Sequence, residues 1–210
     1  PVFLDHHLCH AASSFLVSPF ERSAILVVDG ASEADTTLMA MGEGAEITVL
    51  DRTPLPHSLG QFYAAMTAFL GFRPDHDEYI VMGLAASGEP TFAAALRREI
   101  VRLLPHGRFE VNTRLLDFHL ARAGLFVEDF VRLFGSPRQS SDELTQRHRD
   151  LAASAQLVLE EVLLHLGRHL RKQPGGSEWK PQRIRSALRQ RFWSDRPDAF
   201  PASPAGCLLD

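Results

Sequence analysis

Three side chains near the start of the sequence have the types and spacing of a metal site. His6 and His10 lie four residues apart, and Asp5, directly before them, is a suitable helix cap. Residues four apart share one face of a helix, so both imidazoles can reach a single ion. Asp29 ends an aliphatic run, where an unpaired buried carboxylate would be unfavourable, and it can supply a third ligand. Two imidazoles and a carboxylate suit Fe(II), Mn(II) or Zn(II).

The residues between these candidates have plainer interpretations. Two histidines at this spacing are, taken alone, more often surface or core residues than ligands, and Asp29 strengthens the metal interpretation. His7 is rotated by about 100° from the face of His6 and His10, so we interpret it as a supporting hydrogen-bonding group. Cys9 also lies off that face, and we expect it to be a small packed residue rather than a ligand.

Two glycine-containing stretches are further candidates. Ser58 and Gly60 precede and open a predicted helix, where free N–H groups suit a phosphate or carbonyl oxygen. An ordinary capped helix start is the favoured alternative there. Gly83 lies within an apolar helical stretch and costs about 1 kcal/mol relative to alanine. It therefore predicts close packing of another helix or contact with a ligand.

The elements that must position these residues follow from hydrophobic periodicity. Strict aliphatic runs predict strands and 3.6-residue periodicity predicts helices. A capping-box pattern, Ser140 with Glu143, predicts the start of the longest helix. The predicted strands are 1–4, 23–29, 36–41, 46–50 and 108–111, and the predicted helices are 6–17, 59–70, 79–86, 91–104 and 141–171. The strands 23–29, 36–41 and 46–50 are expected to pair in an antiparallel sheet.

The composition limits the class of protein. The net charge of −4 gives no reason to expect a nucleic-acid partner for the whole chain. No apolar run approaches the roughly 20 residues that cross a bilayer, so we expect no membrane partner. Two distant cysteines make no disulfide framework, and we expect a cytoplasmic protein with free thiols. The Arg-rich segment 175–210 carries tryptophans that could stack on bases, but its sparse apolar residues favour weak order instead.

Four stretches in fixed order carry a resemblance that is more specific than any one of them. They are His6-His7-x-x-His10-Ala11-x-Ser13-x-Phe15 with Ser18-Pro19-Phe20, then Asp29-Gly30-x-x-Glu33-x-x-Thr36-Thr37, then Pro56-His57-Ser58-Leu59-Gly60 to Leu70-Gly71-Phe72, then Glu78-Tyr79-x-Val81-Met82-Gly83-Leu84-Ala85. Over roughly residues 1–172 the chain strongly resembles the N-terminal domain of the nodulation-type O-carbamoyltransferases. It is also similar to the hydrogenase-maturation carbamoyltransferases and the tRNA threonylcarbamoyl transferases.

The resemblance implies a fold, a reaction and a set of site residues. The fold would be α/β, a partial actin, sugar-kinase and heat-shock ATPase type with a mixed sheet and flanking helices. The reaction would transfer a carbamoyl group from carbamoyl-adenylate, made from carbamoyl phosphate and ATP, to a hydroxyl of a sugar or antibiotic. His6, His10 and Asp29 would hold Fe(II), with zinc or manganese as alternatives. Ser58, Gly60 and Gly83 would lie at the nucleotide, and His7 is a candidate for accepting the hydroxyl proton.

The sequence also departs from that family. Ile80 stands where the family usually has lysine, and Ala86-Ser87-Gly88 stands where it usually has Pro-Tyr-Gly. Gly175-Gly176 is followed by a basic segment instead of the family's aliphatic strand and loop. We therefore expect a partial transfer domain at 1–174, incomplete at both ends and inactive alone, with a weakly ordered or frame-shifted tail at 175–210. The alternative is a truncated, non-catalytic remnant that at most binds a metal.

Overall fold

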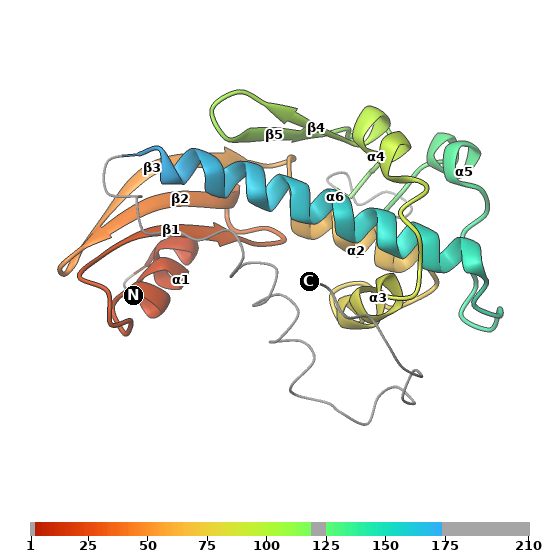
Figure 1. The fold of residues 1–210 in the computed structure, drawn as a ribbon, viewed down its shortest axis with the longest axis horizontal. Helices are drawn as coiled ribbons and strands as arrows, with labels where there is room; N and C mark the ends of the chain where they lie inside the picture. Colours follow the sequence, from red (N-terminus) through yellow and green to blue (C-terminus); the bar gives the residue numbers. More distant parts are fainter. Residues whose placement is uncertain (1–2, 119–124, 174–210) are drawn as a thin grey trace, which may run out of the picture. The chain divides into compact units, whose positions relative to one another are not determined.

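The computed structural model describes residues 3–118 and 125–173 (Figure 1). All of the described elements belong to one compact unit. In chain order they are α1 His6–Phe15, β1 Arg22–Val28, β2 Asp35–Glu43, β3 Glu46–Pro54, α2 Leu59–Phe69, α3 Glu78–Ala85, α4 Ala93–Glu99, β4 Val101–Leu104, β5 Arg108–Val111, α5 Glu128–Phe134 and α6 Gln146–Arg171. The α/β class expected from the sequence is confirmed.

The three consecutive strands β1, β2 and β3 form one antiparallel sheet in the order β1-β2-β3. The predicted antiparallel pairing is therefore confirmed. The mixed sheet implied by the resemblance is not seen among the described strands, because the second sheet, β4-β5, is antiparallel as well.

β1 and β2 pack against other elements on both faces of the three-stranded sheet, whereas β3 is largely exposed. Because side chains alternate along a strand, Ile25 and Leu38 face α1 and pack with its buried Phe15. Met39 faces the opposite side and joins the main core formed by α2 and α6. The continuous aliphatic run of β1 follows from this two-sided burial.

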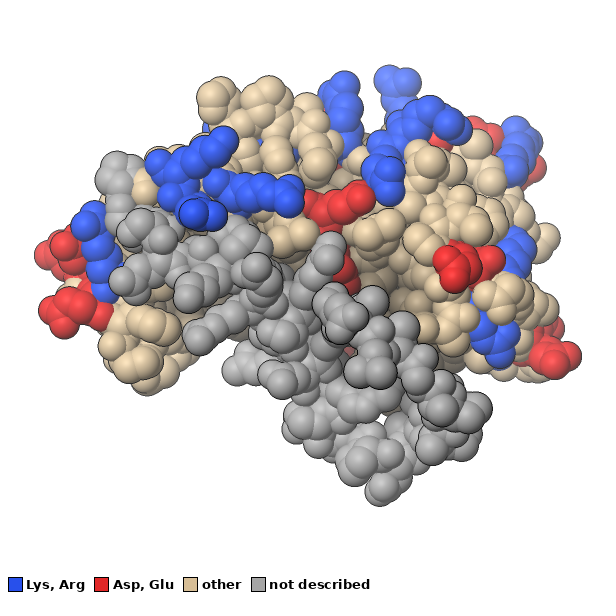
Figure 2. Space-filling view, viewed as in Figure 1, with Lys and Arg blue, Asp and Glu red and all other residues tan. Residues whose placement is uncertain are grey.

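The long helix α6 runs past the sheet and along α2 (Figure 1). The apolar periodicity of the sequence predicts a stripe of Leu144, Leu151, Ala155, Val158, Val162 and Leu166. The last five are each at most 1% exposed, whereas Leu144 lies before the helix and is partly buried. Its last turn carries Arg168, His169 and Arg171. Figure 2 shows Lys and Arg side chains gathered over this end of α6, where the helix dipole favours positive charge.

The predicted start of α6 at Ser140 is wrong. The helix begins after Thr145, where the Thr145 N–H donates to Nδ1 of His148 at 3.1 Å and completes a capping box. Arg138 instead donates to the carbonyls of Ser140 and Asp142, so the Ser140 segment forms a turn before the helix. Residues 112–140 had no predicted element, and α5 lies within them.

The predicted helix over 91–104 is also wrong in its second half. Helix α4 ends at Glu99, and Val101–Leu104 becomes β4, paired with β5 from Val101↔Val111 to Leu104↔Arg108. His106 and Gly107 form the turn between them with φ of 61° and 68°. Backbone pairing across this hairpin overrides the amphipathic pattern, as tertiary context often does.

The ends of the chain leave two expectations open. The strand expected over 1–4 is absent at Phe3 and Leu4, which are 90% and 72% exposed; residues 1 and 2 lie outside the described residues. The segment 175–210 also lies outside them. Within the described part of the chain, no helix combines the length and the apolar character needed to cross a membrane.

Candidate metal centre

Helix α1 starts where the sequence places its cap. Asp5 precedes the helix, and its Oδ1 accepts a hydrogen bond from the Leu8 N–H at 2.8 Å. His6 and His10 then project from one exposed face, as their spacing predicts. Asp29 follows β1 on the same face as Val27, which is the face that packs against α1. The strand therefore delivers its carboxylate to the two imidazoles.

The three side chains converge on one point. Nε2 of His6 lies 3.0 Å from Oδ2 of Asp29 and 3.0 Å from Nε2 of His10. Nε2 of His10 lies 3.6 Å from Oδ2 of Asp29. Two ligand atoms that are each 2.1 Å from the same ion lie about 3.0 Å apart when the ligand–ion–ligand angle is a right angle. They lie about 3.4 Å apart when that angle is tetrahedral. Among the described residues, this is the one group of three potential ligands close enough to share an ion.

The two carboxylate oxygens of Asp29 have different partners. Oδ1 accepts from the Gly30 N–H at 2.7 Å, which leaves Oδ2 directed at the histidines. Partial burial would raise the pKa of Asp29, but the hydrogen bonds from Gly30 and His6 outweigh it and hold the pKa below its ordinary value. The group is therefore a carboxylate, the form that binds a cation.

Ser58 and Gly60 lie directly behind Asp29. Ser58 is fully buried, caps α2 by accepting from the Gln61 N–H at 3.0 Å, and donates to the Gly30 carbonyl. A Cβ at Gly60 would lie 2.6 Å from the Gly30 Cα and 2.9 Å from the Asp29 carbonyl oxygen. The predicted close approach at Gly60 is thus an approach of α2 to the turn that carries the ligand. Contact of either residue with a nucleotide stays a prediction.

His7 lies beneath the exposed pair. Its side chain is fully buried, and neither ring nitrogen has a hydrogen-bond partner among the described residues, so the hydrogen-bonding role expected from the sequence is wrong. Burial lowers the pKa of His7, so the ring is neutral. Its ring meets that of His6 edge to face at 5.8 Å between centroids. Cys9, in contrast to the expectation of a packed residue, is exposed.

Gly83 belongs to a different part of the structure. It lies in α3, which packs against α2 and α6. The close approach to α6 occurs at Gly88, where a Cβ would lie 2.0 Å from the Arg149 carbonyl oxygen. The structure thus places the tight helix contact five residues after Gly83, and a ligand at Gly83 stays a prediction.

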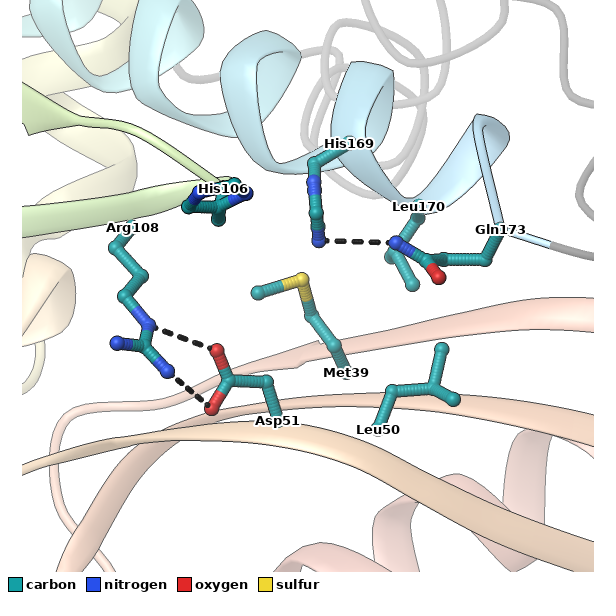
Figure 3. Close-up of a pocket in the computed structure, with 8 residues that line it drawn as sticks. All are labelled: Met39, Leu50, Asp51, His106, Arg108, His169, Leu170 and Gln173. Carbon is teal, nitrogen blue, oxygen red and sulfur yellow. Dashed lines mark hydrogen bonds and ion pairs between the residues drawn. The ribbon is translucent and has the colours of Figure 1, made fainter.

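A separate cavity of about 210 Å³ opens where the turn of the β4-β5 hairpin meets β3 and the end of α6 (Figure 3). Four of its polar side chains form two pairs. Arg108 Nε donates to Asp51 Oδ2 at 3.0 Å, and Gln173 lies 3.1 Å from Nε2 of His169. Burial lowers the pKa of His169, which suits a neutral ring that accepts from Gln173. The sequence analysis singled out none of these residues.

Comparisons with known proteins identify the family of the chain. A family model described as the carbamoyltransferase N-terminus matches residues 2–178. An uncharacterized protein of Synechocystis is 39% identical over 177 residues, which are 83% of this chain and 28% of that protein. Nodulation protein NolNO of Sinorhizobium fredii is 38% identical over 80% of this chain and 23% of its own length. Nodulation protein NolO of Bradyrhizobium diazoefficiens is 38% identical over 82% of this chain and 29% of its own length.

These matches fix the class of the protein. The chain spans about a quarter of the length of these curated relatives. The chain is an α/β domain, and the family model matches it over most of its length. The chain belongs to the carbamoyltransferase family and corresponds to its N-terminal domain.

Proposed function

We propose that this chain is the metal-binding part of an O-carbamoyltransferase, in which His6, His10 and Asp29 hold one divalent ion. The observation that carries the proposal is the convergence of the three donor atoms, with both histidine–carboxylate distances and the histidine–histidine distance between 3.0 and 3.6 Å. Imidazole and carboxylate donors suit Fe(II), and they also suit Zn(II) or Mn(II). His6 and His10 are about half exposed, so the donor set is open toward solvent, as a catalytic site requires.

The proposed reaction moves a carbamoyl group to a hydroxyl. The donor is carbamoyl-adenylate, which is formed from carbamoyl phosphate and ATP. A divalent ion bound here would act as a Lewis acid toward the carbamoyl carbonyl. The acceptor oxygen forms a bond to the carbamoyl carbon, the bond from that carbon to the AMP phosphate oxygen breaks, and the hydroxyl proton passes to a base. Membership of the family supports the carbamoyl donor and a hydroxyl acceptor in general. A sugar or antibiotic acceptor and the actin and heat-shock ATPase type of fold rest on the sequence resemblance, and a cytoplasmic location rests on the absence of a disulfide framework from the sequence.

The packing of three predicted residues refines their proposed roles. His7 is fully buried, which favours a supporting role under His6 over direct contact with an acceptor hydroxyl. Ser58 and Gly60 are packed against Gly30, so we propose that they act by fixing the turn that follows Asp29.

Metal loading tests the proposed ligands. The chain is stripped with a chelator, loaded without oxygen with Fe(II), Zn(II) or Mn(II), desalted and assayed by mass spectrometry for bound metal. We expect about one ion per chain and its loss in His6→Ala and His10→Ala. His76→Ala is the matched control, because His76 is an exposed histidine 3.0 Å from a carboxylate, that of Asp77, away from the centre. No bound metal in the unmodified chain would contradict the proposal.

A transfer assay separates the enzyme from a non-catalytic remnant. The loaded chain is incubated with carbamoyl phosphate, ATP and a sugar acceptor, and the acceptor is analysed for the added carbamoyl mass. Turnover that disappears in His6→Ala would support catalysis by this chain. Bound metal without turnover is the result that we expect, because a partial transfer domain should be inactive alone.

A further inference from the structure

One guanidinium group bridges the residue that caps α1 and the first residue of β2, the strand that follows the loop after Asp29. Arg52 lies near the end of β3, and its side chain is 29% exposed. Its Nη2 donates to Oδ2 of Asp5 at 2.9 Å, and its Nη1 donates to Oδ2 of Asp35 at 2.9 Å. The two acceptors are 47 and 17 residues away in sequence. Arg52 is the residue near the site that the sequence analysis missed.

The first contact, from Arg52 to Asp5, lies at the start of α1. Asp5 uses one carboxylate oxygen to cap the helix at Leu8 and the other to accept from Arg52. The Asp5 carbonyl also accepts from the Cys9 N–H at 3.0 Å, within the first turn that contains His6. Movement of the Asp5 side chain therefore moves the first turn of the helix that bears both histidines.

The second contact, from Arg52 to Asp35, lies at the end of the loop that follows Asp29. The Asp29 N–H donates to the Thr36 carbonyl at 2.9 Å, and the Ser32 N–H donates to the Asp35 carbonyl at 2.9 Å. Arg52 holds Asp35 at the point where this loop returns into β2. The same side chain thus fixes the helix on one side of the metal centre and the loop on the other.

We propose that Arg52 is a positioning residue of the metal centre, which sets the separation between the histidines of α1 and Asp29. The inference rests on the proposed function in that it assumes that these three residues bind a metal. Arginine suits the task because its planar fork presents two donors at a fixed angle, whereas lysine presents one flexible ammonium group. Ligands must be held within about 0.5 Å of the productive geometry, so loss of this brace should weaken metal binding without removing a ligand.

The test compares Arg52→Met and Arg52→Lys with Arg102→Met. Arg102 is the control, because it forms an ion pair with Glu110 across the β4-β5 hairpin and contacts neither Asp5 nor Asp35. Zinc affinity is measured by competition with a chromophoric chelator. Amide hydrogen exchange of residues 6–15 is measured without metal, with exchange in α6 as the internal reference for the global fold.

We expect Arg52→Met to weaken zinc binding about tenfold, as loss of a residue that supports metal ligands typically does. Exchange in residues 6–15 should accelerate while exchange in α6 stays unchanged. Arg52→Lys should fall between Arg52→Met and the unmodified chain, and Arg102→Met should match the unmodified chain. Wild-type affinity and wild-type exchange in Arg52→Met would overturn the inference. If the unmodified chain binds no zinc, the proposed function fails, and the exchange of residues 6–15 alone decides whether Arg52 positions α1. If α6 also exchanges faster in Arg52→Met, the global fold of that variant has changed. Zinc affinity and the exchange of residues 6–15 in Arg52→Lys then test the inference.

Discussion

Oδ2 of Asp29 lies 3.0 Å from Nε2 of His6, although 23 residues separate them in sequence. This contact joins the end of a strand to the first turn of a helix. It depends on the cap at Asp5, on the Asp29-Gly30 turn and on the helix packed behind that turn. Substitutions at these supports should therefore change the site without touching a ligand.

The cap of α1 gives the first prediction. Asp5→Ala removes the acceptor for the Leu8 N–H and the partner of Arg52, and should lower the free energy of unfolding by about 1 kcal/mol. Asp5→Asn keeps a capping oxygen and should lose less. Urea unfolding of the three proteins checks this. Equal stability of Asp5→Ala and the unmodified chain would show that the cap does not hold the helix.

The close approach at Gly60 gives the second prediction. Glycine-to-alanine changes inside helices normally stabilise a protein by up to about 1 kcal/mol. Here the added methyl group would lie 2.6 Å from the Gly30 Cα and displace the backbone that carries Asp29. Gly60→Ala should therefore destabilise the chain and weaken zinc binding, as thermal unfolding and zinc titration would show. A stabilised variant with unchanged zinc affinity would contradict the packing described here.

The cap of α6 gives a prediction about pH. Burial lowers the pKa of His148, whereas a histidine in the unfolded chain has a pKa of about 6.5. As the pH falls below about 6.5, the unfolded chain binds a proton that the folded chain does not, so the free energy of unfolding falls. His148→Gln retains an acceptor for the Thr145 N–H but cannot titrate.

Urea unfolding at pH 7.5 and pH 5.5 measures this difference. The unmodified chain should lose more stability on acidification than His148→Gln does, by at most about 1.4 kcal/mol per pH unit. Equal losses in the two proteins would show that His148 does not contribute to the pH dependence.

Local patterns predicted the parts of the structure that local interactions determine. The spacing of His6 and His10 and the cap at Asp5 specify one helical face, and the aliphatic run before Asp29 specifies a buried strand. The sequence analysis therefore named the three residues that the fold brings together.

Features that depend on distant partners could not be predicted in this way. Val101–Leu104 has an amphipathic helical pattern, and its pairing with β5 decides its structure. Arg52 gives no local signal, because both of its partners are far away in sequence. The burial of His7 depends in the same way on the sheet that α1 packs against.

X-ray absorption at the zinc edge of the loaded chain tests the central claim most directly. The account predicts nitrogen and oxygen neighbours at about 2.0–2.1 Å. It also predicts an imidazole multiple-scattering pattern, which should be lost or weakened in His10→Ala. A sulfur neighbour at about 2.3 Å, which the exposed Cys9 could supply, would contradict the account. So would a His10→Ala spectrum identical to that of the unmodified chain.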